Sequence, residues 1–222
     1  MENKFKYILF DFDGTLTDSS EGIFKSLTYA FEFYGHGTPT KELLRKFIGP
    51  PLHYSFSNFC GFSDGHCLEM TEKYRERYRK IGYLENRIYD GVREMLRALY
   101  ENGFVLATAS SKPLKFVNDI CENLDIKKYF TFLGATAFDN IKESKAFVIE
   151  DAMKNLGASK NNTLMVGDRL FDIEGAHTVG IPCCAVLYGF GSREEFEEHH
   201  AEYIVEKPAD ILDIVSKSKE VK

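Results

Sequence analysis

Apolar positions along the chain follow two different patterns, and the change between them divides the sequence. Residues 7–10 form a short apolar run, Tyr-Ile-Leu-Phe, which is typical of a buried strand. The next stretch, residues 19–88, shows no alternation typical of strands and carries apolar residues at helical spacing. Helices are expected there at 19–34, 39–47, 52–59 and 64–79. This pattern indicates a small helical bundle inserted after the first strand.

From residue 91 onward, short apolar runs alternate with helical segments. Strands are expected at 104–109, 130–134, 163–166, 182–187 and 203–205. Helices are expected at 91–100, from 113, at 144–156 and between 168 and 180, and residues 208–215 are expected to complete the outer edge of the sheet together with 203–205. Strands separated by helices pair in parallel through right-handed crossovers, so the sequence predicts an α/β fold. The predicted division is a core of residues 1–18 and 89–222 with an inserted domain of residues 19–88.

The overall charge of the chain restricts the classes of partner. The 222 residues carry a net charge of −6 without a basic block, which argues against a nucleic-acid backbone as the main partner. No apolar run approaches the roughly 20 residues that cross a bilayer, so no membrane segment is expected. Residues 1–6 lack the pattern of a secretory signal, and we expect a cytoplasmic protein.

The five cysteines are odd in number and show no C-x-x-C spacing, as expected for reduced thiols. Cys60, His66 and Cys67 could be imagined as zinc ligands, but no second ligand pair follows at the spacing of a zinc finger. Cys183 and Cys184 are adjacent in a predicted strand and therefore face opposite sides, where core packing is the better interpretation.

Two carboxylates follow the first strand. Asp11 and Asp13 project to the same side of an extended segment, whereas Phe12 points away. Gly14 permits a sharp reversal at the carboxyl end of the strand, where open α/β sheets place their ligands. The two acids repel each other unless a cation or a proton relieves them. The alternative is a loop with two solvated aspartates.

A second polar segment, Ser110-Ser111-Lys112, follows the strand predicted at 104–109. Pro113 suits the first position of a helix. The backbone N–H groups of that helix start, together with the Ser110 hydroxyl, would form an anion site. Simple helix capping by a serine is the alternative.

A lysine occupies the first turn of the helix predicted at 144–156. Lys145 follows the expected N-cap Ser144 and faces the positive end of the helix dipole, which is unfavourable by roughly 0.3 to 1 kcal/mol. A bound phosphate or neighbouring aspartates would compensate this lysine, whereas the alternative is a solvated surface side chain. Lys142 is a rival candidate for the same role.

Two more acids follow the strand predicted at 163–166. If a helix begins at Asp168, Asp172 lies four residues on and both carboxylates share one face. A preference for acids at a helix N-terminus is the alternative. With Asp11 and Asp13, four acids would then lie at strand ends on one side of the sheet, and such oxygen-rich clusters suit Mg²⁺.

These motifs carry a resemblance to a known family. They are, in chain order, Asp11-Phe12-Asp13-Gly14-Thr15, Ser110, Lys145 and Gly167-Asp168-x-x-x-Asp172. They resemble the four motifs of the haloacid dehalogenase superfamily, and the helical insertion is similar to its α-helical (C1-type) cap. The most similar subgroup is the phosphoglycolate phosphatase-like enzymes. The resemblance implies a Rossmann-like parallel sheet core with helices on both faces, plus a helical-bundle cap domain.

The resemblance also implies a role for each motif. Asp11 would be the nucleophile that forms an aspartyl-phosphate, and Asp13 the general acid and base. Mg²⁺ would be bound by the Asp11 carboxylate, the Asp13 backbone carbonyl and Asp168, with Asp172 in support. Ser110 and Lys145 would hold the phosphoryl oxygens. Many relatives have Thr-Asn at the second motif, so the phosphate contact could fall on Ser111 instead.

The expected function is Mg²⁺-dependent hydrolysis of small phosphate monoesters, with phosphoglycolate or nucleoside monophosphates favoured. An acid at Asp13 indicates phosphate esters, because dehalogenases and phosphonatases of the superfamily lack it. One alternative is a β-phosphoglucomutase-like phosphomutase, which would yield an isomerised sugar phosphate and no free phosphate. The other is a non-catalytic regulatory module, which would be favoured by loss of the acids.

The inserted domain offers candidates for substrate contact. Arg45 and Lys46 could reach a carboxylate or second phosphate of the substrate, whereas the alternative is a solvated helix face. We expect a monomer or weak homodimer whose partner is the small phosphate ester.

Overall fold

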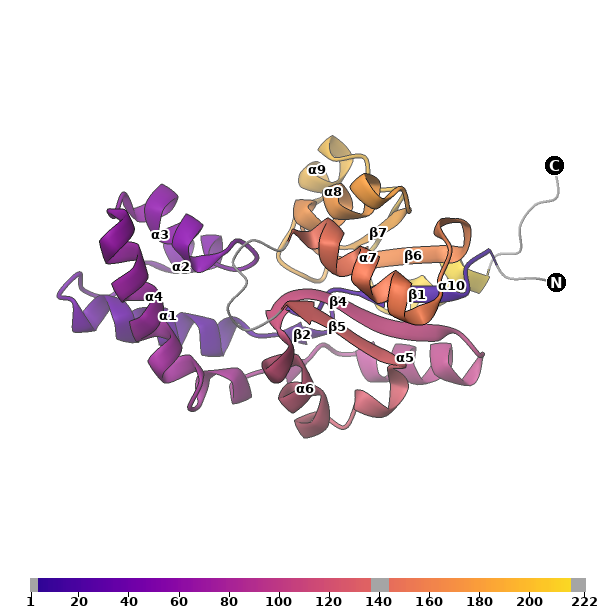
Figure 1. The fold of residues 1–222 in the computed structure, drawn as a ribbon, viewed down its shortest axis with the longest axis horizontal. Helices are drawn as coiled ribbons and strands as arrows, with labels where there is room; N and C mark the ends of the chain where they lie inside the picture. The colour runs from indigo at the N-terminus through magenta and orange to yellow at the C-terminus, as the bar shows by residue number, and fades with distance from the viewer. Residues whose placement is uncertain (1–3, 137–143, 217–222) are drawn as a thin grey trace. The chain divides into compact units, whose positions relative to one another are not determined.

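The computed structural model describes residues 4–136 and 144–216 of the chain (Figure 1). The chain forms two compact units, one of residues 1–17 and 88–222 and the other of residues 18–87. The boundaries predicted from the sequence, 18 and 89, lie one residue from these. The predicted role of the smaller unit as a cap stays a prediction.

The larger unit is built on one parallel sheet of six strands. The strands are β1 (Tyr7–Phe10), β4 (Val105–Pro113), β5 (Phe132–Thr136), β6 (Thr163–Gly167), β7 (Cys183–Val186) and β8 (Tyr203–Val205). Their order is β5-β4-β1-β6-β7-β8, and every pairing is parallel. The strand order places β1 between β4 and β6, so its carboxyl end lies between the ends of two neighbours. The α/β fold predicted from the alternation of strands and helices is confirmed.

Helices cover both faces of this sheet (Figure 1). One face carries α7 (Lys145–Leu156) and α8 (Leu170–Val179), which contact each other and the sheet. The other carries α5 (Val92–Glu101), α6 (Leu114–Asn123) and α10 (Asp210–Ser216). Short 3₁₀ turns follow at η2 (Lys127–Tyr129) and η3 (Lys160–Asn162).

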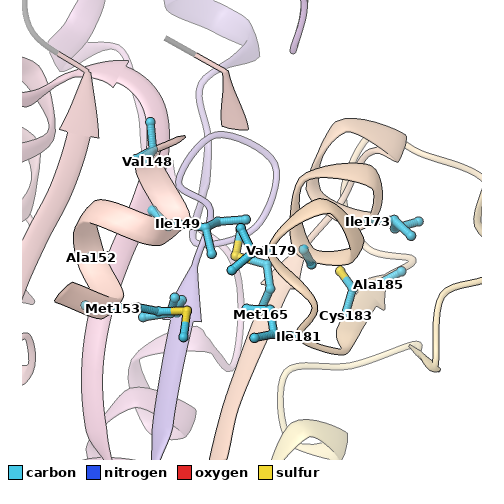
Figure 2. Close-up of a cluster of buried hydrophobic side chains, with 14 of the residues drawn as sticks. Val148, Ile149, Ala152, Met153, Met165, Ile173, Val179, Ile181, Cys183 and Ala185 are labelled. Carbon is cyan, nitrogen blue, oxygen red and sulfur yellow. The ribbon is translucent and has the colours of Figure 1, made fainter. Parts of the chain in front are cut away.

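A buried apolar cluster joins α7 and α8 to the sheet, and Figure 2 shows its side chains meeting between these elements. Val148, Ile149 and Ala152 of α7 face alternate residues of the central strands, such as Leu9 of β1. Cys183 belongs to this cluster, and both it and Cys184 are fully buried. The predicted packing role of the two cysteines is confirmed. The cluster fixes the two helices whose N-terminal ends carry Lys145 and Asp172.

Residues 208–215 were predicted only to complete the outer edge of the sheet, and most of them belong to the helix α10. A second helix was also absent from the prediction. Helix α9 (Arg193–Glu198) reads Arg-Glu-Glu-Phe-Glu-Glu, and Phe196 is its one buried residue. Ser192 caps it by accepting a hydrogen bond from the Glu195 backbone N–H at 3.2 Å. Six residues with a single apolar position give no helical period to detect.

The smaller unit contains the four predicted helices: α1 (Ser20–Phe33), α2 (Lys41–Lys46), α3 (Leu52–Cys60) and α4 (Asp64–Tyr78). Its core includes a group of aromatic rings in which Phe31 contacts Phe47, Phe56 and Phe62. A 3₁₀ turn, η1 (Gly82–Leu84), follows α4. No helix among the described residues combines the length and the apolar character that crossing a membrane requires.

Two strands of two residues each, β2 (Thr17–Asp18) and β3 (Arg87–Ile88), pair where the chain passes from one unit to the other. The Arg87 guanidinium donates to Asp18 Oδ2 at 2.7 and 3.1 Å. The prediction of an entirely helical insertion over 19–88 was wrong at Arg87–Ile88, because two residues are too few to show alternation.

Candidate active site

Asp11 directly follows β1 at the carboxyl edge of the sheet. Its backbone N–H donates to the Val166 carbonyl at 2.8 Å, so the parallel pairing extends one residue beyond the strand. The chain then turns at Gly14, whose φ is +90° and whose N–H donates to the Thr17 carbonyl at 2.8 Å. A Cβ on Gly14 would lie 2.1 Å from Asp168 Oδ2. The turn predicted at Gly14 is confirmed, and glycine is required there for both reasons.

Lys145 links two carboxylates. Its ammonium lies 2.6 Å from Asp11 Oδ1 and 2.7 Å from Asp172 Oδ1, and it also donates to the Ala109 carbonyl at 3.1 Å. The Lys145 side chain is 9% exposed, so these contacts are made out of bulk water. Ser144 caps α7 by accepting from the Phe147 N–H at 3.2 Å. Neighbouring aspartates therefore compensate a lysine at a helix N-terminus, as the sequence predicted.

Asp168 is fully buried beneath the turn that follows β1. The Thr15 hydroxyl donates to its Oδ1 at 3.1 Å, and the Phe190 backbone N–H donates to its Oδ2 at 2.9 Å. Gly189 permits this approach, because a Cβ there would lie 2.4 Å from the Asp168 Cβ. Both oxygens are thus oriented by donors from distant segments, and neither Phe190 nor Gly189 carries a sequence signal that pointed to the site.

Asp172 lies close to Asp168 for a different reason from the one predicted. Helix α8 begins at Leu170, so Asp168 lies outside it and the assumed helical i,i+4 pair is wrong. Asp172 Oδ2 instead accepts hydrogen bonds from the backbone N–H groups of Asp168 and Arg169, at 3.1 and 3.0 Å. The carboxylate caps its own helix and leaves Oδ1 for Lys145.

Asp13 pairs with a lysine that the sequence analysis did not single out. The Lys112 ammonium lies 2.9 Å from Asp13 Oδ1 and 2.7 Å from Oδ2. Strand β4 extends to Pro113 and not to residue 109, and α6 begins at Leu114. Pro113 therefore precedes the helix in an extended conformation, with ψ 133°, and the prediction that it occupies the first helical position was wrong.

The two serines of the second motif differ in environment. Ser110 is 2% exposed, and its hydroxyl accepts from the Lys112 backbone N–H at 3.2 Å. Ser111 is exposed, and its carbonyl accepts from the Thr136 hydroxyl at 3.0 Å. Neither lies at a helix N-terminus, because the strand continues through both. The choice between them for phosphate binding stays a prediction.

Burial dominates the electrostatics of the acids. Desolvation and repulsion from Asp172 raise the pKa of Asp11 to about 6, although Lys145 acts in the opposite direction. Desolvation, with repulsion from Asp172 and Asp11, raises the pKa of Asp168 well above its usual range. For Lys145, burial would lower the pKa, but attraction to Asp11 and Asp172 outweighs it and the pKa is raised. The site therefore holds more negative charge than one lysine relieves.

Asp11, Asp168 and Asp172 each offer a carboxylate oxygen within 4.8 Å of the other two. Among the residues that the structure describes, these three form the one group of Asp, Glu, His or Cys side chains whose ligand atoms lie close enough together to hold a metal ion. Buried, oxygen-only ligands suit a hard divalent cation, which would relieve the repulsion that raises their pKa values. The donor set thus fits a divalent metal. Cys60, His66 and Cys67 are not part of such a group.

Two further predicted residues belong to the smaller unit. Arg45 is exposed in the last turn of α2, in the smaller unit, and its predicted contact with substrate stays a prediction. Lys46 of the same helix lies over the Phe59 ring at 5.9 Å. Lys142 lies outside the described residues.

Comparison with known proteins agrees with this geometry. The model of the haloacid dehalogenase-like hydrolase family matches residues 8–186. The chain belongs to this family. It is 38% identical over 196 residues to a 5'-nucleotidase of Pseudomonas aeruginosa, covering 88% of this chain and 89% of the relative. It is 28% identical to a phosphoglycolate phosphatase of Vibrio parahaemolyticus, covering 96% and 97%.

Solved structures show the same fold. A haloacid dehalogenase-like family hydrolase from Streptococcus pneumoniae superposes with a TM-score of 0.89 at 30% identity, covering 95% of this chain and 98% of that chain. The family membership and the α/β fold expected from the motifs are therefore confirmed. The chain is a hydrolase of this family.

Proposed function

We propose that the protein is a Mg²⁺-dependent phosphatase that hydrolyses small phosphate monoesters through an aspartyl-phosphate at Asp11. The observation that carries this proposal is the position of Asp11, at the carboxyl edge of the sheet, in contact with the cation Lys145 and within 4.8 Å of the acids Asp168 and Asp172. A carboxylate nucleophile beside a fixed positive charge suits transfer of a phosphoryl group, whose oxygens carry negative charge.

In the first step, an Asp11 carboxylate oxygen attacks phosphorus and the bond between phosphorus and the ester oxygen breaks. Asp13, as a carboxylic acid, gives its proton to that oxygen, so the leaving group departs as an alcohol. In the second step, Asp13 takes a proton from water, whose oxygen attacks the phosphorus of the aspartyl-phosphate. The bond to Asp11 breaks, and phosphate and the free carboxylate result.

Lys145 and Ser110 would hold the oxygens of the phosphoryl group during both steps. Asp11, Asp168 and the Asp13 backbone carbonyl would hold Mg²⁺, with Asp172 in support. When bound, the metal would neutralise charge on the phosphoryl group and on the acids. Thr15 and the Phe190 N–H fix the Asp168 oxygens, so the ligand is oriented before any ion binds.

The substrate class we propose is a nucleoside monophosphate or phosphoglycolate. The two relatives named a 5'-nucleotidase and a phosphoglycolate phosphatase support these two choices. We further propose that residues 19–88 act as a cap that closes over the bound ester and excludes water. Arg45 of this unit would contact an anionic or polar part of the substrate.

The test is phosphate release from adenosine 5'-monophosphate, 2-phosphoglycolate and p-nitrophenyl phosphate, with and without Mg²⁺. Asp11→Asn should lower turnover by about 10³-fold or more while the circular dichroism spectrum stays unchanged. Asp213→Asn, on an exposed position of α10, is the matched control and should retain full turnover. Retained turnover in Asp11→Asn would overturn the nucleophile assignment. Isomerised ester without free phosphate would indicate a mutase.

A further inference from the structure

Lys112 places a positive charge in a buried position at the edge of the site. Its side chain is 5% exposed, and its ammonium contacts both oxygens of Asp13, at 2.7 and 2.9 Å. Contact with both oxygens holds the carboxyl group at the end of β4 and restricts its position. The pair is therefore a device for orienting Asp13, and not only for neutralising a charge.

A bulge in β4 places Lys112 where it contacts Asp13. Ser110 pairs with Ala135 and Pro113 pairs with Thr136, so β4 has two residues, Ser111 and Lys112, where β5 has none. Such a bulge re-aims a side chain and is common next to active sites. The Lys112 N–H donates to the Ser110 hydroxyl at 3.2 Å, and the Thr136 hydroxyl donates to the Ser111 carbonyl at 3.0 Å. These two hydrogen bonds stabilise the bulge.

We infer that Lys112 is a positioning residue for Asp13, which it orients for proton transfer to the leaving group. This inference rests on the proposed function, in which Asp13 is the general acid. An ammonium only donates hydrogen bonds, so it cannot accept one from a protonated carboxyl group. It can still donate to the oxygen that lacks the proton. Lys112 therefore holds Asp13 as a carboxylate through both oxygens and as an acid through the oxygen without the proton, and leaves the protonated oxygen for the leaving group.

A purely structural lysine and a positioning lysine differ in one measurable respect. Loss of a structural ion pair lowers activity toward every ester to the same extent. Loss of positioning affects only those esters whose leaving oxygen needs a proton. Alkyl esters such as adenosine 5'-monophosphate and 2-phosphoglycolate leave as strongly basic alkoxides, whereas p-nitrophenolate is a weak base that leaves without one.

The experiment compares kcat/KM of Lys112→Met for the better of those two alkyl esters and for p-nitrophenyl phosphate. The value of kcat/KM includes only the steps up to alcohol release, so hydrolysis of the common aspartyl-phosphate does not mask the difference. We expect a fall of about 10- to 100-fold for the alkyl ester, within the range of general acid catalysis, and less than about threefold for the aryl ester. Equal falls for both esters would overturn the inference.

Four further variants make the result specific. Lys112→Arg keeps the cation, and a guanidinium can contact both oxygens of a carboxylate, so the ratio of alkyl to aryl kcat/KM should stay within about threefold of wild type. A ratio shifted as far as in Lys112→Met would contradict the inference. When Lys112→Met is added to Asp13→Asn, the ratio of alkyl to aryl kcat/KM should change by less than about twofold, because the carboxyl group that Lys112 positions is no longer present. Lys128→Met, at an exposed ion pair with Asp125, is the matched control.

Failure of the proposed function is distinguishable from failure of this inference. A wild-type protein that releases phosphate from none of the three esters contradicts the proposed function, and the inference falls with it. A wild-type protein that hydrolyses both kinds of ester, with a Lys112→Met ratio equal to wild type, contradicts the inference alone. Melting temperatures of all variants report whether the fold is retained.

Discussion

Gly175 of α8 lies directly against the stem of Lys145. A Cβ on Gly175 would stand 2.6 Å from Lys145 Cγ and 2.9 Å from its Cβ. Because Gly175 has no side chain, the aliphatic part of Lys145 can pass close to the backbone of α8. Because the Lys145 ammonium contacts Asp11 and Asp172, the geometry of the acids depends on a residue that carries no functional group.

Gly175→Ala should displace Lys145 and lower kcat/KM by about 10- to 100-fold, since small displacements of a positioning group cost that much. Alanine in a helix interior normally stabilises by about 1 kcal/mol relative to glycine, so an unchanged or lower melting temperature would show the clash. Gly65→Ala is the matched control, because Gly65 lies in α4 with open space around its Cβ position. Full activity in Gly175→Ala would contradict the prediction that a side chain at this position displaces Lys145.

Mg²⁺ should raise the melting temperature, and EDTA should reverse the rise, because an ion that binds only the folded acids stabilises the fold. At 100 times the dissociation constant, the expected gain is about 2.7 kcal/mol. Asp168→Asn should abolish this response. In the absence of metal the same variant should melt higher than wild type, since it removes a buried negative charge near Asp11 and Asp172. If metal-free Asp168→Asn melts below wild type, Asp168 is not destabilised by repulsion from Asp11 and Asp172.

Thr15→Val should weaken Mg²⁺ binding by about 10- to 100-fold, the usual effect of losing a residue that orients a metal ligand. Thr15 is fully buried and donates to Asp168 Oδ1, and valine has nearly the same shape without the hydroxyl. Calorimetric titration with Mg²⁺ measures the effect. Thr178→Val, whose exposed hydroxyl donates within α8, is the control. Unchanged affinity in Thr15→Val would show that Asp168 needs no such orientation.

Glu85 should make the smaller unit sensitive to acid. Hydrogen bonds from Arg77, at 2.7 and 3.0 Å, and the contact from Lys25 lower the pKa of Glu85 below its ordinary value of 4.5. A lowered pKa means that the folded state favours the carboxylate. Its contribution to stability is present above about pH 4.5 and is lost as the pH falls through the lowered pKa.

Glu85→Gln should therefore be less stable than wild type at pH 7, by about 1 to 3 kcal/mol, and the difference should narrow as the pH falls from 5 to 3. Urea unfolding at several pH values measures this difference. Glu101→Gln, at an exposed end of α5, should show no such trend. A difference that stays constant with pH would exclude the carboxylate as its source.

The sequence predicts those parts of the site that follow from periodicity and parallel pairing. Asp11 and Asp168 end strands that read as short apolar runs, so their meeting at one edge follows from the topology. Lys145 is predictable because a lysine at a helix N-terminus needs compensation. Their chemical roles rest on the family resemblance and stay predictions.

The parts that escaped prediction depend on local geometry without a periodic signal. Lys112 reaches Asp13 only because β4 bulges after Ser110 and continues to Pro113, whereas its apolar pattern ends at Ala109. Phe190 contributes a backbone N–H, which any residue other than proline could supply. Asp172 approaches Asp168 because its carboxylate accepts a hydrogen bond from the Asp168 backbone N–H. Helical spacing alone does not predict this contact.

The central place of β1 has a consequence for how the chain acquires its site during synthesis. Tyr7 is made well before its partners in the sheet, Val105 and Thr163. At about 5 to 20 residues per second, β1 waits roughly 8 to 30 s for its second neighbour. Until then Phe10 has no completed sheet to cover it, and Asp11 lacks Asp168. Nascent chains should thus expose an apolar strand and require protection before any catalytic competence exists.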